Sequence, residues 1–456
     1  MTSNADGQVD QGHDSIIVRA LCRLVNVRKG EVAAMLWSAA YFFFLLGGYY
    51  MLRPVRETFG IQRGADILAT LFTGTWLVML LVNPIFAWMT SRLPRRRFIP
   101  VTYHFFSLNI LLFYGALMLL PDELKEYAGY VFYVWLSVFN MFAVSVFWAF
   151  MADVFSSEQG KRLFPFIGVG GTLGAMGGAA AAATLVAYIE TPNLLPIAVV
   201  MIQCAVFCVW RLIRISSARM SARASSDSPV HINEGEPSRD WKAGFVLLLK
   251  SPYLLGIGAY IALMTVLATF VYFEQARWIS EIFESDEERT AAFAMLDLVA
   301  NALTLIFQLF LTARLTRAVG VGKMLAILPV ITAGGFIALT LAPMFMTFAV
   351  FQVGRRATQY AIARPVREVL FTVVGPDEKY KSKAFIDTFI YRGGDVVGAW
   401  AHRGLAAVGV GLAPVAAVMG AAWVAIALAL GAAHRRKASP GEAATREQDS
   451  GFAPDD

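Results

Sequence analysis

Two arginine-rich pentapeptides hold the side chains best suited to binding an anion. The segment Arg53-Pro54-Val55-Arg56-Glu57 recurs as Arg364-Pro365-Val366-Arg367-Glu368, and each copy lies close to a long apolar run. A guanidinium group binds phosphate or carboxylate through two parallel hydrogen bonds. Arginine in or beside a membrane span is costly, and it marks a substrate pathway or a paired structural charge. The repeat therefore predicts that Arg53, Arg56, Arg364 and Arg367 bind an anionic substrate.

The first copy also has a purely structural interpretation. On a helix, Arg53 and Arg56 share a face, and Glu57 lies one turn from Arg53. Arg53 would then extend to the outer membrane interface and pair with Glu57, with no substrate involved. Pro54 removes a backbone donor and bends or restarts the helix, and such a bend would tip both arginines toward a cavity.

The second copy lies in a predicted span over 345–370, which also contains Arg355 and Arg356. Four arginines exceed what an ordinary span tolerates, so several of them must line water or pair with acids. The candidate partners are Glu368, Asp387 and Asp395. A structural network of ion pairs is the alternative to a substrate site.

Other charged residues within the predicted spans are candidates for binding, coupling or charge balance. Arg392 and Asp395 are three residues apart in the span 384–408, so we expect them to pair, with Arg392 as a further substrate-binding candidate. Asp297 lies within the span 290–312, and an acid there is a functional candidate by default. The predicted coupling set is Glu57, Glu274, Asp297, Glu368 and Asp395.

A gate and an aromatic contact complete the candidate residues. Asp153 follows the span 128–151 at its inner end, and we expect it to form a cytoplasmic gate with Lys161 and Arg162. Tyr50 and Tyr360 lie beside the two arginine motifs, and their rings can stack on a planar base. The alternative for both tyrosines is a place in the core or in the aromatic belt of the membrane interface.

The elements that must position these side chains are membrane helices. Of the 456 residues, 57% are hydrophobic and 16% are charged, whereas about a quarter are charged in ordinary globular proteins. The basic residues lie in short clusters between apolar runs, which is not the footprint of a nucleic-acid-binding protein. A spanning helix needs about 20 mostly apolar residues. Twelve runs fit: 32–52, 65–89, 98–120, 128–151, 164–188, 194–213, 254–273, 290–312, 323–341, 345–370, 384–408 and 412–433.

The short loops predict the orientation and the division of the chain. Basic residues gather on the side of both termini and of the Ser- and Arg-rich stretch between the sixth and seventh runs, which makes that side cytoplasmic. Arg53 and Arg56 lie at the outer end of the first predicted helix, against this rule, and substrate contact would explain the exception. We expect a cytoplasmic segment (1–31), a six-helix bundle (32–213), a cytoplasmic linker (214–250), a second six-helix bundle (251–433) and a disordered cytoplasmic tail (434–456).

The two bundles are related by internal similarity. Thr90-Ser91-Arg92-Leu93 closes the second run and Thr312-Ala313-Arg314-Leu315 closes the eighth, an offset of 222 residues that lays the first helix on the seventh and the fourth on the tenth. Two six-helix halves joined by a cytoplasmic linker are typical of the major facilitator superfamily, whose substrate site lies between the halves near mid-membrane.

A glycine repeat marks one helix contact. Gly170, Gly174 and Gly178 recur every four residues in the run 164–188. This spacing lets two helices meet backbone to backbone, so the run predicts a packing surface on which one helix can rock against another.

Three stretches carry a resemblance to a known family: 49–57 (YYMLRPVRE), 147–155 (FWAFMADVF) and 158–162 (EQGKR). They resemble bacterial relatives of the ATP/ADP translocase (nucleotide exchange) family, a distant branch of the major facilitator superfamily. The resemblance spans nearly all twelve predicted helices. It implies a protein that exchanges ADP for ATP or takes up nucleotides.

The sequence therefore predicts an all-α transporter of the bacterial inner membrane that moves a nucleotide, or another phosphorylated or anionic metabolite, by alternating access. We expect a monomer in the lipid bilayer, with no cofactor, no metal and no enzymatic constellation. Two alternatives stay open. One is a proton-coupled transporter of an unrelated small molecule, which would depend on an acid such as Asp297. The other is a non-transporting sensor or scaffold with the same fold. The number of intramembrane charges argues against it, because a bundle that serves only for packing would be expected to lose them.

Overall fold

Helices form every regular element in the part of the chain that the structure describes, as the apolar runs predict. The computed structural model describes residues 27–62, 64–92, 95–223, 241–312, 319–375, 378, 382, 383 and 385–450. The N-terminal half is built from η1 (Lys29–Glu31), α2 (Val32–Gly60), η2 (Ala65–Ile67), α3 (Leu68–Arg92), α4 (Arg95–Leu119), α5 (Asp122–Val154), α6 (Ser157–Leu185), η3 (Thr191–Asn193) and α7 (Leu194–Arg223).

The C-terminal half follows a segment that lies outside the described residues. Its elements are α8 (Trp241–Lys250), α9 (Pro252–Ile282), α10 (Asp286–Phe307), η4 (Gln308–Thr312), α12 (Val321–Leu341), α13 (Phe345–Thr358), η5 (Gln359–Ala363), α14 (Arg364–Leu370), η6 (Phe371–Val373), η7 (Ile386–Ile390), α16 (Tyr391–Ala407) and α17 (Leu412–Ser450). The predicted linker is partly helical, because α7 continues to Arg223 and α8 begins at Trp241.

Helices occupy the twelve predicted runs in the described chain, and three of these runs include a π-helical turn: η4 at the end of 290–312, η5 within 345–370 and η7 within 384–408. Ten helices in the described chain are long and apolar enough to cross a membrane. The spans predicted over 345–370 and 384–408 are interrupted by the π-helical turns η5 and η7. Such turns recur at functional sites, and these two spans also carry many of the intramembrane charges.

Two predicted helix ends are wrong. The first helix does not stop at residue 52, because α2 runs on to Gly60 with Pro54 in its interior. Arg53, Arg56 and Glu57 therefore lie within a helix of 29 residues rather than at its outer end. The last helix continues to Ser450, into the tail predicted as disordered from residue 434. The segment contains Ala, Glu and Arg, which favour helices, together with Pro440 and Gly441, which do not.

The glycine repeat of α6 forms the predicted backbone contact, and its partner is α2. A Cβ atom on Gly170, Gly174 or Gly178 would lie 2.5, 2.1 and 2.1 Å from the backbone oxygens of Ala39, Phe43 and Gly47. Only glycine permits two helices to approach so closely at these positions. This contact fixes α2, which carries the first arginine motif, against the rest of its half.

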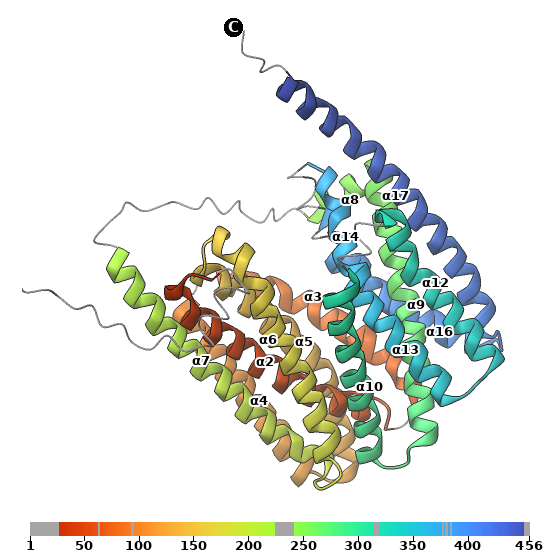
Figure 1. Ribbon diagram of the computed structural model, residues 1–456. Coiled ribbons are helices and arrows are strands. Elements are labelled where there is room, and N and C mark those ends of the chain that lie inside the picture. The colour runs from red at the N-terminus through yellow and green to blue at the C-terminus, as the bar shows by residue number, and fades with distance from the viewer. Residues whose placement is uncertain are drawn as a thin grey trace, which may run out of the picture.

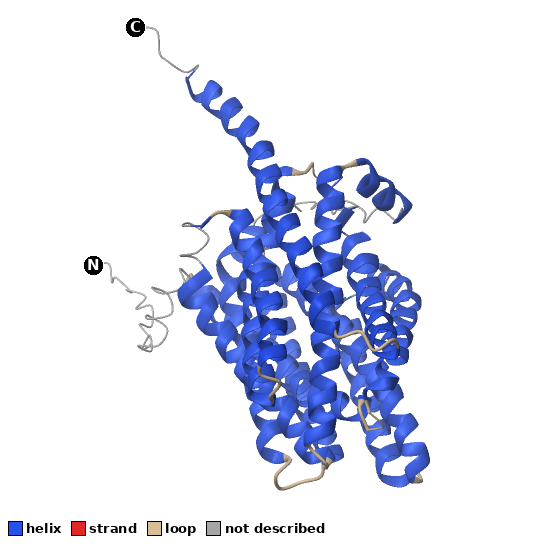
Figure 2. Cartoon of the chain, turned by 90° about the vertical axis from the view of Figure 1, so that its right-hand side faces the viewer, coloured by secondary structure: helices blue, strands red, loops and turns tan. Residues whose placement is uncertain are grey.

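Each half has its own apolar core, and a third cluster joins them. Figure 1 shows the N-terminal half in red to yellow-green and the C-terminal half in green to blue, with α10 beside α6. The third cluster unites Ile61, Leu68 and Tyr133 of the first half with Phe273 and Phe293 of the second. The helices of both halves run along the length of the molecule, and α17 extends past the others (Figure 2). The halves are thus packed together near the C-terminal end of α2.

Candidate anion-binding site

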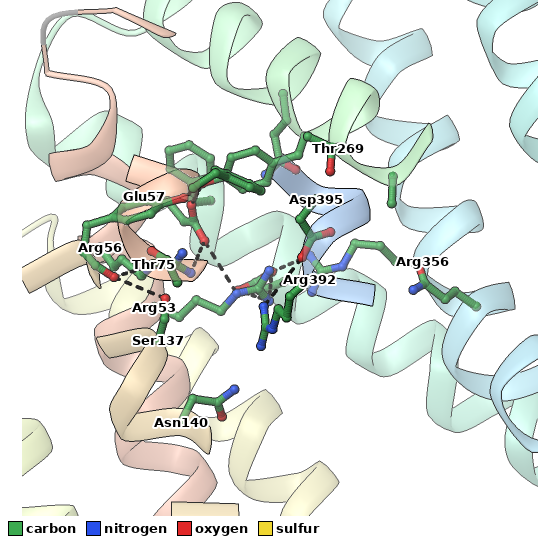
Figure 3. Close-up of a pocket in the computed structure, with 18 of the residues that line it drawn as sticks. Arg53, Arg56, Glu57, Thr75, Ser137, Asn140, Thr269, Arg356, Arg392 and Asp395 are labelled. Carbon is green, nitrogen blue, oxygen red and sulfur yellow. Dashed lines mark hydrogen bonds and ion pairs between the residues drawn. The ribbon is translucent and has the colours of Figure 1, made fainter. Parts of the chain in front are cut away.

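A cavity of about 240 Å³ lies between the two halves. We call it the central cavity. Helices α2, α3 and α5 line it from the first half, and α9, α10, α13, η5 and α16 line it from the second. Figure 3 shows the charged side chains of both halves turned toward one another. The charged residues of the lining are Arg53, Arg56, Arg355, Arg356, Arg392, Glu57, Asp297 and Asp395.

One buried carboxylate joins the two halves. Asp297 on α10 is 3% exposed, and it accepts hydrogen bonds of 2.9 and 3.0 Å from Nη1 of Arg53 on α2. It also accepts one from Nη1 of Arg356 on α13. A buried charge needs such compensation to be tolerated. The result is an ion triad that spans the interface, with one acid between two arginines.

The rest of the first motif forms a second network across the interface. The Arg56 guanidinium lies 3.9 Å from the centre of the Tyr133 ring, donates to the Tyr133 carbonyl at 3.1 Å and to Glu57 at 3.3 Å. The hydroxyl of Tyr272, on the second half, donates to Glu57 and lies 2.8 Å from the Tyr133 hydroxyl. Arg53 and Glu57 are 3.8 Å apart, as the structural interpretation of the motif expects, yet both line the cavity.

Two adjacent arginines of α13 are the residues that the sequence-based candidate set leaves out. Arg355 and Arg356 are each 5% exposed and line the central cavity. Arg355 donates to the side-chain oxygens of Gln352 at 3.3 Å and of Gln359 at 3.2 Å, which are neutral. Nη2 of Arg356 is buried and has no hydrogen-bond partner among the described residues. Two adjacent arginines within a predicted span are the sequence signal for these residues, because such charges must line water or pair with acids.

The expected pair Arg392–Asp395 forms at 3.6 Å at the edge of the central cavity. Arg392 also lines a second cavity of about 350 Å³, which we call the side cavity. Trp76 on α3 is the other residue that lines both. The two cavities therefore meet at Trp76 and Arg392.

The second arginine motif lies elsewhere. Arg364 is exposed and Arg367 is 3.8 Å from its neighbour Glu368, which also pairs with Lys383. Neither arginine lines the central cavity. Tyr360, which precedes the motif in η5, does line it. The two copies of the pentapeptide are therefore not equivalent in the fold.

Two more candidates, Tyr50 and Glu274, lie away from the cavity lining. Tyr50 lies with its ring centre 5.7 Å from the Arg53 guanidinium. Glu274 pairs with Arg277 at 2.6 Å and lies 3.9 Å from His402. The side chain of Asp387, another expected partner of the arginines, lies outside the described residues.

The predicted cytoplasmic gate contains an acid that the sequence did not suggest. Arg162 pairs with Glu31 at 3.2 Å, and Gln159 donates to Glu31 at 2.8 Å. Burial raises the pKa of the Glu31 carboxyl, but hydrogen bonds from Gln159, the Arg28 backbone and Arg162 outweigh this effect and leave the pKa below its usual range. Asp153 is exposed at the end of α5, and the Lys161 side chain lies outside the described residues.

Polar contacts close the interface beyond the central cavity. The hydroxyls of Thr58 and Thr290 are 2.8 Å apart, Gln62 donates to Asp286 at 2.7 Å, and the Thr191 backbone donates to Glu287 at 3.2 Å. These contacts join α2 and η3 to the start of α10. The structure therefore shows a conformation in which this end of the interface is shut.

No family model and no curated protein matches the sequence. Solved structures do match almost the whole fold. Nucleoside transporter NupG is 10% identical, with a TM-score of 0.58 over 89% of this chain and 99% of that one. An auto-inhibited POT family peptide transporter is 14% identical, with a TM-score of 0.58 over 88% and 97%.

A third match is a bacterial homolog of the human lysosomal transporter Spinster, in an inward-facing and unoccupied conformation. It is 13% identical, with a TM-score of 0.54 over 90% of this chain and 97% of that chain. These similarities establish the major facilitator fold that the two six-helix halves predict. At sequence identities of 10–14%, these similarities establish the fold but do not indicate the substrate.

Proposed function

We propose that this protein is a secondary transporter that carries an anionic metabolite across the bacterial inner membrane by alternating access. The observation that supports this most is the central cavity, in which five arginines face three carboxylates between two helical halves. In facilitator-type transporters the substrate site lies at this interface, and the halves rock about it. Desolvated arginines in excess of acids favour a negatively charged substrate.

The arginines divide into a group that would bind the anion in the cavity and a group that would lie along its route to the cavity. Arg53, Arg56 and Arg392 line the cavity from both halves and would hold the anion together with Arg355 and Arg356. The exposed Arg364 and the partly buried Arg367 lie one to two turns beyond Tyr360 along the same segment. They would attract the anion on its way between the cytoplasm and the cavity, since clustered positive charge raises the local concentration of anions.

A nucleotide is our first candidate for the substrate, and the ATP/ADP translocase family our candidate for the nearest relatives. The sequence resemblance supports both, and one structure of the same fold belongs to a nucleoside transporter. Tyr133, Tyr272, Phe72 and Trp76 line the central cavity and offer rings for a base. The basic loops support an orientation with both termini in the cytoplasm, and in that orientation the shut end of the interface would face outward.

The test is uptake of labelled ATP and ADP into proteoliposomes, with and without unlabelled nucleotide inside. Uptake that requires internal nucleotide is expected for an exchanger. Arg392→Gln should abolish it, whereas Arg403→Gln should not, because Arg403 is an exposed arginine on the same helix and stands against the Trp400 ring. Failure of folded protein to take up either nucleotide would refute the nucleotide assignment, and failure over a panel of anions would refute transport and favour a sensor or scaffold.

A proton-coupled transporter is the second candidate, and the position of Asp297 favours it. This acid lies buried between arginines of the two halves, where a change in its charge would weaken the contact across the interface. Uptake in that case should collapse when a protonophore removes the proton gradient. An exchanger driven by its counter-substrate should keep its rate under the same treatment.

A further inference from the structure

Two arginines on the outer surface of α7 have no acidic partner. Arg211 and Arg214 are exposed and lie one turn apart on the helix. Neither side chain forms an ion pair or donates a hydrogen bond to any described residue; each instead lies over an aromatic ring. A charge at the end of a membrane span is costly unless water or a counter-charge reaches it. Both arginines are therefore open to a negative group that the described protein does not supply.

The rings under these arginines are tryptophans of two helices that pack side by side, α2 and α7 (Figure 1). The Arg214 guanidinium lies 3.3 Å from the centre of the Trp210 ring, and that of Arg211 lies 5.4 Å from the centre of the Trp37 ring on α2. The ring of Phe207 joins the two, with ring centres 5.8 Å from Trp37 and 6.2 Å from Trp210. We call these five residues the Trp–Arg patch. Stacking occupies the face of a guanidinium and leaves the N–H groups at its edge free to donate.

The patch lies at the expected level of the lipid head groups. Arg211 is two residues from the end of the predicted span 194–213, and tryptophan gathers at membrane interfaces. Side chains of a helix point toward its N-terminus, and Arg214 accordingly lies over Trp210, one turn deeper in the bilayer. An arginine that only avoids lipid would extend toward water instead. The excess of basic residues on the cytoplasmic side explains the charges, but not their position on the rings.

An apolar strip leads from the patch into the bilayer. Val200 and Phe207 precede Arg211 on one face of α7, at spacings of seven and four residues. Val200 is 63% exposed and Phe207 is 51% exposed, so both side chains face lipid. The surface is thus apolar along its length and carries two cations at its end. This is the complement of a phospholipid, whose acyl chain ends in a phosphate.

We propose that the Trp–Arg patch binds the head group of an anionic phospholipid, with an acyl chain along Val200 and Phe207. The phosphodiester lies between the two guanidinium groups, whose edges donate to its oxygens. A zwitterionic head group brings an ammonium that two arginines repel, so a lipid such as phosphatidylglycerol fits better. In the proposed orientation the patch lies in the cytoplasmic leaflet, where anionic lipids attract basic residues. The patch shares no residue with the central cavity, so the inference holds whatever the substrate is.

Two lipids with the same acyl chains test the head group. The full-length protein in detergent would be titrated with dioleoyl phosphatidylglycerol, dioleoyl phosphatidylcholine and soluble glycerophosphoglycerol. Melting temperature and the lipid retained in native mass spectrometry report binding, because a ligand of the folded state stabilises it. Phosphatidylglycerol should bind about tenfold or more tightly than phosphatidylcholine. The soluble head group should bind far more weakly than the lipid, because it has no chain to cover the apolar strip.

Variants assign the preference to the patch. The double variant Arg211→Gln with Arg214→Gln should lose about tenfold or more in phosphatidylglycerol binding, since each basic residue near the head groups contributes about fivefold. Both side chains are exposed, so its melting temperature without lipid should change little. Trp37→Leu keeps both charges but removes one ring, and should weaken binding about threefold. Arg403→Gln is the matched control, because Arg403 is also exposed and lies over the Trp400 ring on another helix.

Several outcomes would overturn the proposal. They are equal binding of the two lipids by the wild-type protein, an unchanged preference in the double arginine variant, or an equal loss in Arg403→Gln. Binding of glycerophosphoglycerol as tight as that of the lipid would replace the lipid by a free anion. A loss in the arginine variant with none in Trp37→Leu would reduce the patch to diffuse positive charge. Failure of the transport assay would refute the proposed function and leave this inference in place.

Discussion

Replacing Asp297 by asparagine removes the one negative charge that lies between two arginines of opposite halves. The side chains involved are 5% exposed for Asp297, 6% for Arg356 and 21% for Arg53. In Asp297→Asn, Arg356 loses its acid partner, and Arg53 retains only Glu57 at 3.8 Å. The substitution keeps the shape of the side chain, so its effect reports on charge rather than on a cavity.

The expected cost follows from this geometry. Removal of one partner from a buried ion pair costs about 3–5 kcal/mol, because the other charge stays behind without compensation. The asparagine oxygen still accepts one hydrogen bond, so we place Asp297→Asn near the lower figure, about 3 kcal/mol. Glu368→Gln is the control, since the Glu368–Lys383 pair is 44% and 33% exposed, and an exposed pair contributes about 1 kcal/mol or less.

The assay is the free energy of unfolding in detergent micelles, with a double-mutant cycle on Asp297 and Arg356. The double variant Asp297→Asn with Arg356→Gln no longer contains the Arg356 charge that Asp297→Asn leaves without its acid. The loss of unfolding free energy in the double variant should therefore be smaller than the sum of the two single losses by about 1.5 kcal/mol or more. A cost for Asp297→Asn no larger than that of Glu368→Gln would refute the reasoning. So would strict additivity in the cycle.

Three further outcomes are expected. Gly174→Ala should destabilise the protein by about 1–3 kcal/mol through overpacking, because the new Cβ would meet the Phe43 carbonyl oxygen. Gly168→Ala on the same helix should not, because nothing lies within 4 Å of its Cβ. Equal melting temperatures for the two variants would contradict the backbone contact. Glu31→Gln should be less stable than wild type at neutral pH. Because the folded-state pKa of Glu31 is lowered, the gap should close as pH falls below the ordinary value of 4.5, and a gap that persists in acid would exclude the ionic contact with Arg162. Thr58 is fully buried at the shut end of the interface. In a chain without its native cysteines, Thr58→Cys should therefore react slowly with an impermeant maleimide when no ligand is present, and faster during turnover. Rapid labelling of the ligand-free protein would contradict that closure.

Some features of the site could be read from local sequence alone. Arg53, Arg56 and Glu57 lie within one helical turn, so their shared face follows from helix geometry. The pair Arg392–Asp395 follows for the same reason, and it forms as expected. The contact of α6 with another helix was likewise readable from the spacing of its glycines. Each of these inferences needs only the geometry of a single helix.

Other features were hidden because their partners are distant in the chain. Asp297 is 244 residues from Arg53, and Tyr272 is 215 from Glu57. A pattern within one helix shows which of its residues share a face, but it does not show which other helix that face contacts. Thr75 and Trp76 line the central cavity, but they carry no charge and belong to no motif, so nothing in the sequence set them apart from other residues of an apolar run.

The sequence by itself determined the class of this protein, because long apolar runs, basic loops and an internal offset dictate a membrane bundle in two halves. It also placed an excess of arginine within those runs. Only the tertiary structure decided which arginines share a cavity. The π turn η5 inserts one extra residue between Arg356 and Arg364, which rotates the following faces by about 100° relative to an unbroken α-helix. The two identical pentapeptides also lie on helices that the internal offset of 222 residues does not relate. They end in different surroundings, one in the interface between the halves and the other outside the lining of its cavity.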